Sequence, residues 1–148
     1  MIGSYARSPQ LANCIGILLD AGGVTMYDAP AVLDLLRGRL DRLAEHLHAD
    51  PSLVHRRFPE LDFGATGTRR LTLKGATLLH MAAEYGNVEA ARLLLDRGAD
   101  LSIRAKLPGH YERPEEVLEC TPLGYARLFP EGSESQARFL LRDQGAVE

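Results

Sequence analysis

The sequence predicts an all-α fold, a solenoid of short paired helices with two elongated loops. A threonine followed two residues later by leucine and five residues later by alanine occurs at Thr77 and again at Thr121. Glycine follows at Gly86 and Gly98, where it suits a turn and a helix end. Between these glycines, apolar residues recur at the spacing of one helix face. Two such short helices cannot bury their shared apolar face alone, so we expect stacked neighbours.

The stretch from Gly75 to Ser102 carries this pattern most completely. Residues 77–82 read Thr-Leu-Leu-His-Met-Ala, which matches the motif T-P-L-H-x-A except for the proline. This stretch therefore resembles an ankyrin repeat. The resemblance implies a helical scaffold that binds another macromolecule, and it implies an internal hydrogen-bonding role for His80.

We interpret residues 1–148 as one domain, because this length is typical of a single domain. Its units are a truncated one at about 1–24, a divergent one at 27–54, and two closer matches at 75–102 and 120–148. In the truncated unit Gly22 corresponds to Gly98, and in the divergent unit Gly38 corresponds to Gly86. A second helix of the final unit is expected around Ala137 to Leu141.

Two connections, residues 55–74 and 104–119, are longer than a repeat of about 33 residues allows, and they are expected to form the finger loops. These loops resemble those of bacterial ankyrin-repeat proteins. The first loop is rich in arginine, and its residues 70–73 could pair as a short strand. The second contains the turn signal Pro108-Gly109.

The leading functional hypothesis is a protein-interaction module that uses the finger loops and the first-helix surface. Arginine presents a planar fork that suits carboxylates, so an acidic partner is favoured. The candidate contact residues are Arg56, Arg57, Arg69, Arg70, Tyr85, His110, Tyr111, Arg113 and Tyr125. An alternative is that the arginines pin the loop onto the stack through Glu84 or Glu89, and that Tyr85 and Tyr125 are packing residues.

A different class of hypothesis is self-association. The truncated first unit would leave Leu11, Ile15 and Leu18 without a full apolar cover, so a homodimer could form through them. A third hypothesis, RNA or another polyanion, is disfavoured by the formal net charge of −3.

Composition and motifs give no support for catalysis, a cofactor or a metal. His46 and Asp50 are two potential ligands where a zinc site needs three or four. Only residue type would join Cys120 to His110 as nucleophile and base. Two cysteines are too few for a disulfide framework, and no apolar run is long enough to span a bilayer. We therefore expect a cytoplasmic protein that is not an enzyme.

Overall fold

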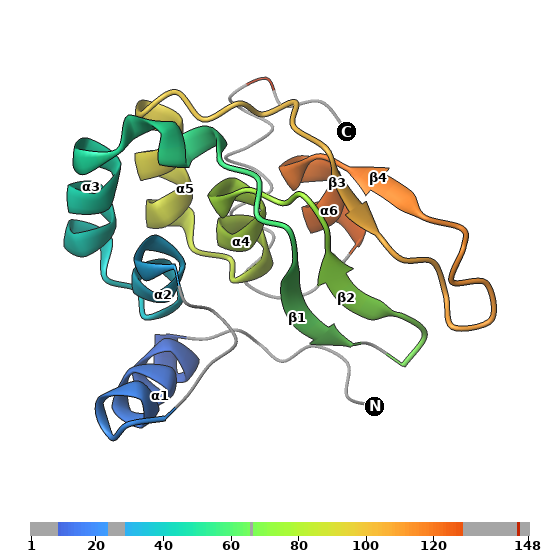
Figure 1. The fold of residues 1–148 in the computed structure, drawn as a ribbon, viewed down its shortest axis with the longest axis horizontal. Coiled ribbons are helices and arrows are strands. Elements are labelled where there is room, and N and C mark those ends of the chain that lie inside the picture. Colours follow the sequence, from blue (N-terminus) through green and yellow to red (C-terminus); the bar gives the residue numbers. More distant parts are fainter. Residues whose placement is uncertain (1–8, 24–28, 66, 129–144, 146–148) are drawn as a thin grey trace.

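The computed structural model describes residues 9–23, 29–65, 67–128 and 145. Helices lie side by side in these ranges, and two hairpins project from them to one side (Figure 1). The elements are α1 (Pro9–Asp20), α2 (Pro30–Leu36), α3 (Leu40–Ala49), the 3-10 helix η1 (Pro51–His55), β1 (Leu61–Ala65), β2 (Arg70–Leu73), α4 (Leu78–Glu84), α5 (Val88–Asp96), β3 (Ala105–Leu107), β4 (Leu118–Cys120) and α6 (Pro122–Leu128). Short helices with small antiparallel strand pairs fit a helical repeat fold.

Glycines with positive φ end the helices at the positions that the sequence predicts. Gly38 and Gly86 have φ of 71° and 58°, and Gly22 and Gly98 have φ of 90° and 83°. Residues with a side chain rarely adopt positive φ, whereas glycine does so without a steric penalty. The two predicted correspondences, Gly22 with Gly98 and Gly38 with Gly86, therefore have the same backbone conformation.

The core centres on α4, all of whose residues are buried. This helix contacts α2, α5 and α6, and in Figure 1 it lies between α2 on the left and α6 on the right. Leu43 and Leu47 of α3 and Leu94 of α5 are each at most 1% exposed. Burial of these side chains is what stabilises helices of seven to ten residues, which would be marginal alone.

The finger loops are antiparallel hairpins. Strand β1 pairs with β2, which confirms the strand expected at residues 70–73, and β3 pairs with β4. An isolated bridge then joins the two hairpins, because Lys74 and Lys106 exchange both backbone hydrogen bonds at 2.9 Å. The expected all-α fold thus gains four short strands, which order the two long connections.

At the N-terminal side, α1 is held near the end of α2 by an ion pair of 2.5 Å between Asp20 and Arg37. The preceding residues of the truncated unit, and the second helix expected around Ala137 to Leu141, lie outside the described residues. Among the helices that are described, none has the length and apolar character needed to cross a membrane.

Candidate functional site: a cationic pocket at the base of the hairpins

His80 fixes the helices beneath the hairpins. Its Nε2 donates to the carbonyl oxygen of Cys120 at 3.0 Å, and its Nδ1 accepts from the backbone N–H of Thr77 at 3.2 Å. Burial lowers the pKa of this histidine to about 4, so the ring is neutral at pH 7. The internal hydrogen-bonding role expected for His80 is confirmed. It ties the start of α4 to the strand that precedes α6.

A depression of about 490 Å³ lies where the two hairpins join. It is lined by Arg57, Lys74, Gly75, Ser102, Arg104, Lys106 and Glu119, which we call the cationic pocket. Every lining residue except Gly75 is exposed. Four of them are cationic and one is acidic, so the pocket concentrates positive charge although the whole chain has a formal net charge of −3.

Strand pairing places the two lysines of the pocket directly opposite each other. Because Lys74 and Lys106 exchange both backbone hydrogen bonds, their Cα atoms are about 5.5 Å apart and their side chains leave the same face. Glu119 of β4 lies opposite Lys106 on its other side. Like charges directly opposite each other destabilise a sheet, so this arrangement carries a local cost.

Arg57 enters the pocket from the chain that precedes the first hairpin. The next residue, Phe58, donates to Ala76 at 2.8 Å and accepts from Gly75 at 2.9 Å, which fixes the backbone beside Arg57. Its guanidinium Nη1 donates to the carbonyl oxygen of Arg104 at 3.3 Å. Arg57 is thus held against the second hairpin, where it lines the pocket.

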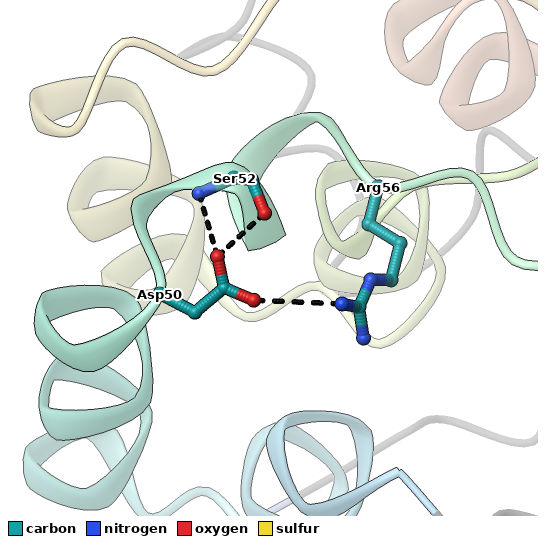
Figure 2. Close-up of polar contacts among 3 residues, drawn as sticks. All are labelled: Asp50, Ser52 and Arg56. Carbon is teal, nitrogen blue, oxygen red and sulfur yellow. Dashed lines mark hydrogen bonds and ion pairs between the residues drawn. The ribbon is translucent and has the colours of Figure 1, made fainter.

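Arg56, the neighbouring residue, belongs to a different contact. Figure 2 shows its guanidinium directed at the carboxylate of Asp50, with 3.4 Å between Nη2 and Oδ2. The other oxygen of Asp50 accepts from the backbone N–H and the hydroxyl of Ser52. These bonds, chiefly the one from the Ser52 hydroxyl, lower the pKa of Asp50. Arg56 follows the alternative in which an arginine pins the loop, with Asp50 as its partner.

The ends of the two hairpins contact each other away from the pocket. Nη2 of Arg69 lies 2.6 Å from Nε2 of His110, and the backbone N–H of Tyr111 donates to Thr68 at 2.8 Å. Arg113 pairs with Glu116 at 3.1 Å within the second connection. The predicted residues Arg69, His110 and Tyr111 therefore lie together, while Arg57 lies at the hairpin base.

Tyr125 is a correction to the predicted contact set. Its side chain is 1% exposed, and its hydroxyl donates to the carboxylate of Glu84 across the α4–α6 contact. Tyr85 is half-buried, with its ring packed edge-on against Phe63 at a centroid distance of 5.9 Å. A side chain buried like Tyr125 has no area left for a partner, so the packing alternative is the correct one for it.

The predicted contact set lacks Lys74, Arg104 and Lys106, which the structure places in one pocket. Arg104 and Lys106 are two residues apart, which places both on one face of an extended chain. That spacing was an available signal. No local sequence signal indicates that Lys74 lies beside Lys106, because this contact depends on pairing between two different hairpins.

The described residues show neither of the chemical pairs considered above. Burial raises the pKa of Cys120 to about 11, and its Sγ donates to the carbonyl oxygen of Ala105. His46 binds Asp34, with 2.7 Å between Nε2 and Oδ2. No group of three or more potential metal-ligating side chains occurs in the part of the chain that the structure describes.

Comparison with known proteins agrees with the geometry. The family model "Ankyrin repeat" matches residues 74–106, which begin and end at the two facing lysines. No curated protein matches the chain. Ankyrin repeats generally mediate protein–protein interactions, and the family is typically non-enzymatic. With α4 and α5 at its centre and a hairpin strand at each side, the segment 74–106 is an ankyrin repeat, and this chain is a protein that carries one.

Proposed function

We propose that the chain is a non-catalytic module, one domain over residues 1–148, that binds an acidic segment of a protein partner on its hairpins. The observation that carries this proposal is the cationic pocket, where four cationic side chains surround a depression with one carboxylate. Opposite charges steer association and fix its register. The paired hairpins support such a site, because strand pairing already fixes the backbone that carries the pocket residues.

Apolar side chains on the second hairpin extend the contact surface. Tyr111, Val117 and Leu118 are 53%, 49% and 39% exposed. Tyrosine and arginine are enriched among the residues that supply most of the free energy in protein interfaces, and complementary charges supply specificity. The partner segment should therefore combine acidic residues with at least one large apolar side chain.

Selection from a library of random linear peptides, run at low and at high salt, tests this proposal. Acidic peptides should be enriched at low salt and lost at high salt, because screening weakens exposed charge pairs. The variant Arg57→Ala should lose this enrichment. The matched control Arg56→Ala should keep it, because Arg56 faces Asp50 rather than the pocket. Enrichment of neutral or basic peptides, or equal loss in both variants, would contradict the proposal.

A second candidate function, homodimer formation, is favoured by two apolar side chains on α1. Ile17 and Leu18 are 69% and 59% exposed. Ile15 packs partly against the protein's own core instead, and the side chain of Leu11 lies outside the described residues. Sedimentation velocity of the wild type and of Ile17→Asp/Leu18→Asp tests this. A dimer should persist in high salt and dissociate in the variant, whereas a wild-type monomer at high concentration removes the hypothesis.

A further inference from the structure

We propose that the cationic pocket binds a phosphate monoester carried by the partner, a phosphorylated serine or threonine side chain. The inference rests on the proposed function, because it names the chemical group that a protein segment would place in the pocket. Its ligands would be Arg57, Lys74, Arg104 and Lys106.

The charge of the pocket exceeds what one carboxylate can balance. Its lining has three more cations than carboxylates. A single Asp or Glu brings one negative charge, whereas a phosphate monoester brings about 1.5 to 2 at pH 7, with three acceptor oxygens. One compact dianion therefore fits the lining better than an acidic side chain.

The donor geometry also favours a phosphate. Lys74 and Lys106 leave one face of the sheet from directly opposite positions, so one group between them can contact both ammonium groups. Lysine binds phosphate as a point charge, and the guanidinium of Arg57 adds a planar fork of donors. Three segments that are distant in sequence thus line the same depression with cationic side chains.

Ion pairs with described carboxylates do not balance three of the four pocket cations. Neither Arg57, Lys74 nor Lys106 forms an ion pair with a described carboxylate, although Glu119 lies opposite Lys106. Other cations of the chain do form such pairs, as Arg37 does with Asp20 and Arg56 with Asp50. A bound dianion would relieve the repulsion between the two lysines.

Three matched peptide pools test the inference. Each pool has the same degenerate flanking positions, with phosphoserine, serine or glutamate at the centre, and binding to the immobilised full chain is quantified by mass spectrometry. We expect the phosphoserine pool to be retained about tenfold more than the other two, through the added charge-assisted hydrogen bonds. Lys74→Gln/Lys106→Gln should abolish this preference, and Arg56→Ala should preserve it. Circular dichroism verifies that both variants fold.

The other outcomes separate the two proposals. Equal retention of the phosphoserine and glutamate pools overturns the phosphate inference and leaves the acidic-segment function standing. If no pool is retained above the serine background, both proposals fail. A single-stranded oligonucleotide that displaces the phosphoserine pool at lower concentration than inorganic phosphate would assign the pocket to nucleic acid, which also overturns the inference.

Discussion

The interior of the ankyrin repeat and its two ends differ in charge: the interior holds a neutral histidine, and the ends hold two exposed lysines. Inside, the buried ring of His80 is neutral and both of its nitrogens have hydrogen-bond partners. At the ends, Lys74 and Lys106 face each other in solvent without a carboxylate at ion-pair distance among the described residues. The repeat is thus stabilised by its interior, while its two ends carry like charges that face each other.

The largest expected loss of stability follows from removing the hydrogen bonds of His80. His80→Ala leaves the N–H of Thr77 and the C=O of Cys120 buried without their partner. Each orphaned group costs about 1–3 kcal/mol, so the free energy of unfolding should fall by about 4 kcal/mol. Urea denaturation followed by circular dichroism measures this. His48→Ala, on the exposed side of α3, is the matched control and should change stability by less than about 0.5 kcal/mol.

The pH dependence of stability sharpens the same comparison. The pKa of His80 is about 4 in the folded chain and 6.5 in the unfolded chain. Only the unfolded chain takes up this proton as pH falls from 6.5 to 4, so stability is full above 6.5 and declines through this window. The loss should be about 3 kcal/mol. Denaturation of wild type and His80→Gln across this range isolates it, and parallel pH curves for the two would contradict the assignment.

The smallest expected change in the free energy of unfolding is an increase. Lys74→Gln removes one of two facing charges, so it should raise the free energy of unfolding by about 0.2–1 kcal/mol at low salt. Added salt should shrink the gain, because it screens the repulsion in the wild type. Lys74→Arg keeps the charge and should leave stability nearly unchanged. A lysine that stabilises the fold instead would make Lys74→Gln the less stable of the two variants.

Local signals in the sequence predicted the repeat well. The motif around Thr77 and the glycines at 22, 38, 86 and 98 are local signals. Each ends or begins a helix within its own unit, so its position follows from neighbouring residues. These signals also predicted the role of His80, because the family motif places histidine there.

The pocket could be predicted only in part. Arg57 was expected in the contact surface, but Arg56 beside it binds Asp50, and composition alone does not separate the two. The approach of Lys74 to Lys106 depends on non-local strand pairing. Tyr125 was predicted as a contact residue, but it is buried by the packing of α6 on α4. This packing cannot be deduced from the sequence of α6 alone.

Binding of an acidic segment in the cationic pocket can be mapped residue by residue. An acidic peptide from the selection is titrated into the isotopically labelled chain, and the backbone amide resonances are followed by NMR. We expect the largest shifts at Arg57, Lys74, Gly75 and Lys106, with little change along α5. Shifts concentrated on α1 or along α5, with the resonances of the pocket unmoved, would contradict it.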